Sequence, residues 1–248
     1  MQNLYEKNEL LFAFLWIGAY LALGTGAGLF DAAAGTQNFL KAIVYGILTG
    51  TLLSFVLKNG YAERFGLCKC ALPLRRFLWF LPLAAAGTAN LWAGVALPGT
   101  ASVTVLYVVT MAFVGLLEEL LFRGLLLNAL KRQGEPLAVV LSSLAFGLMH
   151  LLNLCNGTPL LFVLCQTVFA TLLGFLFAVI VTRGKSLLPC IAAHCLFDVT
   201  SVFTDQAALT PACFYTINGI VIGVMLIYLL FLHKTLPKQT QHVQPTEI

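Results

Sequence analysis

The chain has 248 residues, of which 60% are hydrophobic and 10% are charged, and its mean hydropathy is +0.92. Soluble domains carry about a quarter charged residues, so this composition excludes an ordinary soluble protein and predicts an integral membrane protein. The net charge of +4 does not indicate a nucleic-acid partner, because the basic residues flank apolar segments instead of gathering on one element. The seven cysteines follow no pattern that predicts a disulfide framework.

Eight apolar stretches follow one another along the chain, each with about the 20 residues that an α-helix needs to cross a bilayer. They are Glu9–Phe30, Asn38–Leu57, Phe77–Leu97, Val103–Leu130, Pro136–Leu154, Pro159–Val181, Ser186–Phe203 and Ala212–Leu232. The sequence therefore predicts an all-α, polytopic membrane helix bundle of about eight transmembrane helices. It would form a single domain over residues 1–234, followed by a polar, disordered tail over residues 235–248.

Positive charges predict the orientation of this bundle. They follow the second, fourth, sixth and eighth stretches, within residues 58–76, 131–132, 183–185 and 234–238, whereas the alternate connections carry almost none. The positive-inside rule places the basic connections on the cytoplasmic side. Both termini, including the polar tail, are therefore predicted to be cytoplasmic.

The fourth stretch contains three ionisable residues within two turns, Glu118, Glu119 and Arg123. Each costs about 2.5–3.5 kcal/mol at the centre of a bilayer, so their default interpretation is a functional site that faces the bundle interior. Glu119 and Arg123 are four residues apart on one helix face and are expected to pair, in a site or as a structural ion pair. Glu118 points about 100° away and has no local partner, which makes it a candidate general base.

Two later stretches bring further ionisable residues to a similar depth. The fifth carries His150, with Phe146 one turn before it, and the seventh carries His194 and Asp198 on one face. At a rise of 1.5 Å per residue, Glu118, His150 and Asp198 all lie about 18–21 Å from the basic ends of their stretches. A carboxylate can take a proton from water, and imidazoles can orient that water or stabilise an oxyanion. No serine, cysteine or threonine is placed to act as a nucleophile, so water-mediated hydrolysis without a cofactor is predicted.

These residues form three motifs that resemble the CAAX prenyl protease and bacteriocin-processing family of intramembrane glutamate proteases, also called the ABI family. The first motif is Glu118-Glu119 followed by Arg123, the second is Phe146 four residues before His150, and the third is His194 four residues before Asp198. Residues 62–67, Ala-Glu-Arg-Phe-Gly-Leu, are similar to a common upstream feature of the family. The motifs cover about a third of the chain and place the catalytic core at about residues 103–204.

The resemblance implies a role for each matched residue. Glu118 would activate the attacking water with help from His150, Glu119 and Arg123 would shape the site, and His194 and residue 198 would stabilise the oxyanion. The prenyl-protein proteases of the family have Asn at that position, whereas this chain has Asp198. An ionised Asp198 could not donate to an oxyanion, so it would either stay protonated or orient His194 instead. The departure weakens the expectation of a prenylated CAAX substrate.

The leading hypothesis is an intramembrane endopeptidase that cleaves a membrane-embedded, lipid-tethered or prenylated protein or peptide, in a bacterial cytoplasmic membrane given the range of the family. Three alternatives remain open. Buried Glu, His and Asp residues are also typical of transporters and proton relays. A non-catalytic peptide-immunity or scaffold protein of the family would keep the same framework. A metalloprotease would use Glu118, His150 and His194 as zinc ligands, although the sequence has no H-E-x-x-H motif.

Overall fold

The computed structural model describes residues 1–237 of the chain, and this part is all-helical apart from one isolated bridge between Val95 and Thr204. Its α-helices are α1 (Gln2–Lys7), α2 (Glu9–Ala34), α3 (Phe39–Lys58), α4 (Leu81–Thr88), α5 (Ala101–Glu119), α6 (Leu127–Leu130), α7 (Glu135–Met149), α8 (Leu160–Gly184), α9 (Leu188–Ser201) and α10 (Pro211–Thr235). Shorter 3₁₀ segments are η1 (Leu74–Phe80), η2 (Ala89–Leu91), η4 (Lys131–Gln133) and η5 (His150–Asn156), and η3 (Leu120–Leu126) is a π-helix.

Six helical segments are long and apolar enough to cross a membrane, within residues 9–34, 39–58, 101–133, 135–155, 160–184 and 211–235. The structure therefore contains a multi-pass bundle, but two of the eight predicted spans are shorter than expected. The eight residues of α4 rise only about 12 Å and the fourteen of α9 about 21 Å, against a hydrocarbon core of about 30 Å.

The third predicted span is broken by its backbone. Leu78, Trp79 and Phe80 all have positive φ angles of 50–57°, and a left-handed conformation ends a right-handed α-helix. The apolar segment Phe77–Leu97 therefore becomes η1, α4 and η2 instead of one long helix. Hydropathy counts apolar side chains and does not register such a break.

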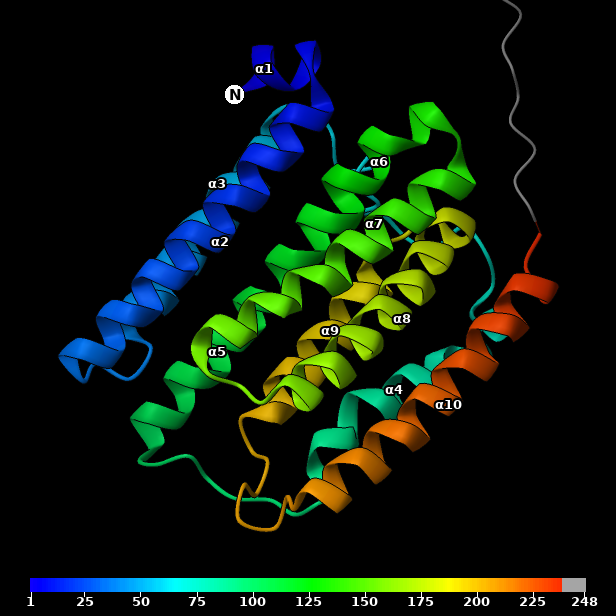
Figure 1. The fold of residues 1–248 in the computed structure, drawn as a ribbon. Coiled ribbons are helices and arrows are strands. Elements are labelled where there is room, and N and C mark those ends of the chain that lie inside the picture. Colours follow the sequence, from blue (N-terminus) through cyan, green and yellow to red (C-terminus); the bar gives the residue numbers. More distant parts are fainter. Residues whose placement is uncertain (238–248) are drawn as a thin grey trace, which may run out of the picture.

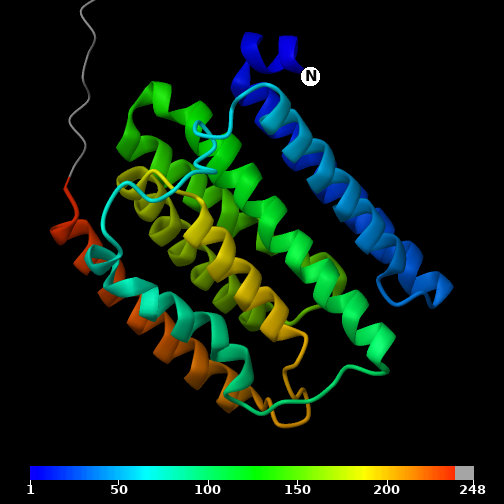
Figure 2. The same cartoon turned by 180° about the vertical axis from the view of Figure 1, so that it is seen from behind.

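Figures 1 and 2 show how the helices are arranged around the centre of the bundle. Helices α2 and α3 form an antiparallel pair that packs beside α5 and η3, while α4 and α10 lie together on the opposite side. Helices α5, α7, α8 and α9 lie between these two pairs. The N-terminus and the C-terminal end of α10 are at the same end of the molecule (Figure 1). Whether that end is cytoplasmic stays a prediction.

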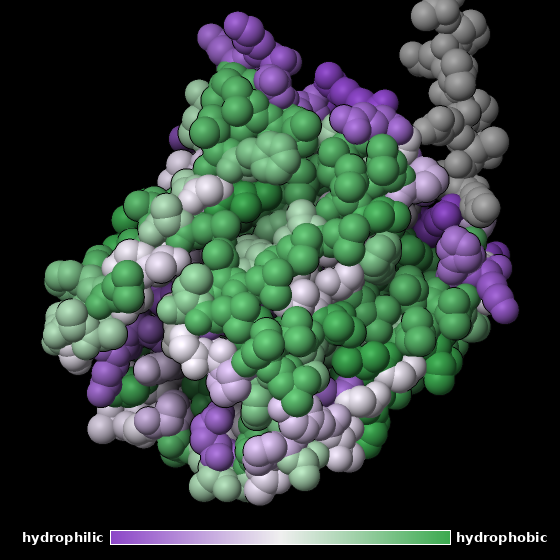
Figure 3. Space-filling model, viewed as in Figure 1, coloured by the Kyte–Doolittle hydropathy of each residue, from purple (hydrophilic) through white to green (hydrophobic). Residues whose placement is uncertain are grey.

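The surface fits a protein surrounded by lipid. Figure 3 shows a broad band of apolar residues between more hydrophilic ends. Large apolar side chains in this band are widely exposed, among them Ile227 on α10, with 71% of its surface accessible, and Leu29 on α2, with 65%. A soluble monomer rarely exposes so large an apolar area. Of the predicted tail, Thr235 is the last residue of α10, and residues 238–248 lie outside the described part of the chain.

At the end of the bundle that contains the N-terminus, ion pairs and a loop connect α2 and α3 to the later helices. Glu9, at the start of α2, is 2.5 Å from Arg64 Nη2 and 2.5 Å from Arg132 Nη2. The connection that follows α3 lies over the end of α8, because Ala71 N donates to Gly184 O at 2.8 Å. The connection thereby brings Phe65 against Gly124 of η3. The first helix pair is thus tied to the helices that carry the motifs.

Candidate active site

The two glutamates lie where an α-helix changes into a π-helix. Glu118 and Glu119 are the last residues of α5, and the π-helix η3 that follows carries Arg123. Such wider turns are rare and are often found at functional sites. All seven residues of η3 are buried. A Cβ atom on Gly124 would lie 2.7 Å from Phe65 Cδ1, so only glycine allows this close approach.

Glu119 and Arg123 form a buried ion pair, as their spacing predicts. Arg123 Nη1 donates to Glu119 Oε1 at 3.0 Å, and the side chains are 1% and 0% exposed. The guanidinium carbon also lies 4.2 Å from the centre of the Phe146 ring and 5.4 Å from that of Phe177. Cation–π contacts of this kind stabilise a desolvated cation. Arg123 is therefore held from both sides, by an acid and by aromatic faces.

His194 connects the acids of two helices. Its Nδ1 is 2.9 Å from Glu119 Oε1, and because a carboxylate accepts, Nδ1–H is the donor. Its Nε2 lies 3.5 Å from Glu118 Oε2 and 3.6 Å from Asp198 Oδ2. Three carboxyl groups therefore surround one imidazole, and Arg123 binds one of the three, that of Glu119.

Glu118 receives a partner that the sequence analysis missed. The hydroxyl of Tyr20, on α2, donates a hydrogen bond to Glu118 Oε1. Tyr20 stacks on Tyr45 of α3, with ring centres 5.3 Å apart and planes inclined by 27°. The expectation that Glu118 lacks a partner therefore holds only within its own helix. The available signal was a tyrosine in the middle of an apolar span, whose hydroxyl needs a hydrogen bond when buried.

His150 lies at the edge of this cluster. It is half-buried, and its Nδ1 is 3.1 Å from the carbonyl oxygen of Phe146 in its own helix. Within residues 1–237, no hydrogen bond or ion pair joins His150 to Glu118 or His194. Both imidazoles instead pack edge-on against Phe146, with ring centres 5.4 Å and 5.7 Å away. Five of the six predicted site residues thus meet directly, and His150 adjoins them through an aromatic ring.

Several polar atoms of the cluster have no protein partner. Glu119 Oε2, Arg123 Nη2 and Asp198 Oδ2 are buried without a hydrogen bond. An unsatisfied buried group costs about 1–3 kcal/mol, so native proteins contain few of them. Three such atoms therefore lie at one place, on three of the predicted site residues.

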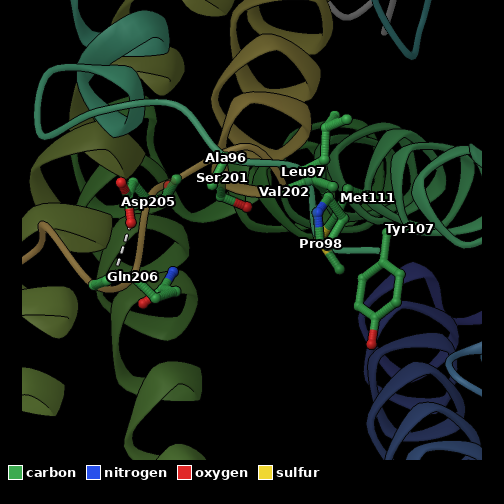
Figure 4. A pocket seen from close by; sticks show the side chains of 11 residues that line it. Ala96, Leu97, Pro98, Tyr107, Met111, Ser201, Val202, Asp205 and Gln206 are labelled. Carbon is green, nitrogen blue, oxygen red and sulfur yellow. Dashed lines mark hydrogen bonds between the residues drawn. The ribbon is translucent and has the colours of Figure 1, made fainter. Parts of the chain in front are cut away.

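A cavity lined partly by α5 and α9 does not contain this cluster. It measures about 540 Å³ and lies where the loops that follow η2 and α9 meet α5 (Figure 4). It is lined by Ala96, Leu97, Pro98, Tyr107, Met111, Ser201, Val202, Thr204, Asp205, Gln206 and Ala207. Between the cavity and Glu118, α5 touches α9, because a Cβ atom on Gly115 would lie 2.9 Å from Cys195 N. Glu118 and Glu119 are buried, with 5% and 0% of their surfaces accessible.

The metal-site alternative needs at least three ligands that point to one position. No group of three or more His, Cys, Asp and Glu side chains in residues 1–237 is arranged to hold a metal ion. His150 is not among the groups that contact Glu118, and Nδ1 of His194 is occupied by Glu119. The proposed zinc ligands Glu118, His150 and His194 are therefore not brought together.

The sequence of residues 100–200 matches the family described as Type II CAAX prenyl endopeptidase Rce1-like. The matched segment runs from the residue before α5 into α9 and includes all three motifs. No curated protein and no solved structure matches the chain. Helices α2 and α3, with Tyr20 and Tyr45, lie outside the matched segment. Residues 100–200, about two fifths of the chain, are therefore similar to an Rce1-like type II CAAX prenyl endopeptidase domain, in a chain with six helical segments long and apolar enough to cross a membrane.

Proposed function

We propose that the protein is an intramembrane endopeptidase that hydrolyses a peptide bond with a water molecule activated by Glu118. Its substrate would be a membrane-embedded or lipid-tethered protein or peptide. The observation that carries this proposal is the position of His194 Nε2, 3.5 Å from Glu118 Oε2 and 3.6 Å from Asp198 Oδ2. A base and two oxyanion donors then face one small volume, the arrangement that hydrolysis requires.

In the proposed reaction, Glu118 Oε2 takes a proton from water while the water oxygen attacks the scissile carbonyl carbon. His194, protonated on both nitrogens, donates from Nε2 to the oxygen that becomes negative, and Asp198 in its neutral form is a second donor. The proton on Glu118 then passes to the leaving nitrogen as the C–N bond breaks. The products are a carboxyl terminus and an amine.

The supporting groups hold His194 in place. Glu119 accepts a hydrogen bond from His194 Nδ1 and is itself bound by Arg123. These contacts fix the orientation of the imidazole on the side opposite to Nε2. Phe146 packs against both imidazoles. In this proposal His150 assists Glu118 once a bound substrate has separated the helices, since catalytic contacts are often loose before substrate binds.

The test is cleavage of a membrane-peptide library by the purified protein in liposomes. We expect cleavage by the parent and its loss in Glu118→Gln and His194→Ala. Glu135→Gln is the matched control, because Glu135 lies at the start of α7 and its nearest cation, Arg183, is 3.9 Å away. Full cleavage by Glu118→Gln would contradict the proposal.

Two other outcomes would favour the alternatives. Loss of cleavage on chelation, restored by zinc, would favour a metalloprotease. Substrate-driven proton flux without cleavage, lost in Glu118→Gln, would favour a transporter. A parent protein that neither cleaves nor transports would fit a scaffold or immunity role.

A further inference from the structure

We infer that Tyr20 of helix α2 is a positioning residue for the general base, Glu118. The α2–α3 pair then belongs to the active site, because it holds the Tyr20 hydroxyl in place. This inference rests on the proposed function. It concerns a part of the chain outside residues 100–200, to which the family match is confined. It starts from the hydrogen bond that joins Tyr20 to Glu118 across 98 residues of sequence.

Both side chains that form this hydrogen bond are buried inside the protein. Tyr20 is 6% exposed and Glu118 is 5% exposed. A buried tyrosine hydroxyl needs a partner, and a buried carboxylate needs donors even more. The described contacts of Glu118 are the Tyr20 hydroxyl and the imidazole of His194. Tyr20 is therefore half of the polar environment of the proposed base.

The hydrogen bond also makes the two carboxylate oxygens of Glu118 different. Tyr20 binds Oε1, whereas Oε2 faces His194 Nε2 at 3.5 Å. Rotation of the carboxyl group would exchange these oxygens, and loss of the tyrosine hydroxyl would leave that rotation free. Tyr20 thus directs one oxygen toward the position where water must be deprotonated, and small errors in such a position are costly for rate.

Tyr20 is itself held by its neighbours on α2 and α3. Its ring stacks on that of Tyr45 at 5.3 Å. Tyr45 lies directly against Gly24, one turn after Tyr20, where any side chain would overlap the tyrosine ring. Figure 1 shows the two helices running side by side next to α5. The pair therefore presents a fixed hydroxyl to the end of α5, and it does so only while it stays packed there.

The experiment compares Tyr20→Phe with Tyr228→Phe. Each variant removes the hydroxyl of a buried tyrosine; that of Tyr228, on α10, donates to Phe77 O at 2.6 Å, in η1 on the other side of the bundle. We expect Tyr20→Phe to lower kcat about 10- to 100-fold with KM unchanged, the effect of one charge-assisted hydrogen bond. Tyr228→Phe should lower thermal stability and leave kcat unchanged. A structural role for Tyr20 would instead give the same result as the control.

Glu118→Gln, measured in the same assay, separates the two proposals. If Glu118→Gln cleaves like the parent, or the parent cleaves nothing, the proposed function is wrong. If Glu118→Gln is inactive while Tyr20→Phe keeps its kcat, only the role of Tyr20 is overturned. The double variant should be no slower than Glu118→Gln, because Tyr20 is inferred to act through Glu118. A further decrease in the double variant would contradict that route.

Discussion

Arg123 Nη1 and His194 Nδ1 bind the same oxygen, Oε1 of Glu119, at 3.0 Å and 2.9 Å. The ion pair within one helix segment therefore continues into a histidine on another. The alternatives of a structural ion pair and a site residue are not exclusive for Glu119, because one carboxylate locks the helices and orients the imidazole. This relationship separates the roles of the two adjacent glutamates.

Glu119→Gln should therefore destabilise the protein, whereas Glu118→Gln should not. Loss of the Glu119 charge leaves Arg123 buried and unpaired, which costs about 3–5 kcal/mol. Gln at position 118 keeps an oxygen that can accept from Tyr20, so the fold is retained. Thermal unfolding in detergent measures the difference. Equal melting temperatures for the two variants would show that Glu119 has no special structural role.

Gly124→Ala tests the close contact between the π-helix and the connection after α3. The new methyl group would lie 2.7 Å from Phe65 Cδ1, and Phe65 is buried with little room to move. We expect a loss of about 1–3 kcal/mol in the free energy of unfolding. Gly18→Ala is the matched control, because nothing lies within 4 Å of its Cβ position. Equal effects at both sites would mean that the contact does not constrain η3.

The all-helical class and the contact between Glu119 and Arg123 could both be predicted from the sequence, because both depend on the spacing of residues along one helix. The i,i+4 pairs Glu119–Arg123 and His194–Asp198 each share a helix face. Hydropathy located every apolar segment, but the backbone of Leu78 to Phe80 broke one of them. The partnership of Tyr20 with Glu118 depends on how α2 packs, 98 residues away in sequence. No local pattern contains that information, and none marks the π-helix.

Increased salt should weaken the fastening at the N-terminal end of the bundle. Glu9 is bound by Arg64 and Arg132, whose side chains are 43% and 72% exposed, so solvent ions can compete. We expect the parent to lose about 1 kcal/mol of stability between low salt and about 1 M salt. Glu9→Gln should show little of this dependence. The measurement is the melting temperature of both proteins across a salt series, and parallel curves would contradict the prediction.

His150→Gln should reduce activity without reducing stability. The described polar contact of His150 is a single hydrogen bond to the carbonyl of Phe146 in its own helix, and the side chain is half-buried. If His150 assists Glu118 in the substrate complex, kcat should fall, but by less than in His194→Ala. Cleavage rates and melting temperatures of both variants provide the comparison. Unchanged cleavage by His150→Gln would remove it from the proposed mechanism.

Asp198→Asn should retain activity, whereas Asp198→Leu should lose it. Glu119, at 2.9 Å from Nδ1, already orients His194, and Asp198 Oδ2 is farther, at 3.6 Å from Nε2. In the proposed mechanism Asp198 is an oxyanion donor, and an amide fills that role as well as a neutral carboxylic acid. Leucine has similar volume and donates nothing, and loss of one oxyanion donor costs about 10²–10³ in kcat. The rate of cleavage at constant substrate measures both variants. A loss in Asp198→Asn as large as in Asp198→Leu would show that the carboxylate charge is required, and would assign Asp198 to the orientation of His194 instead.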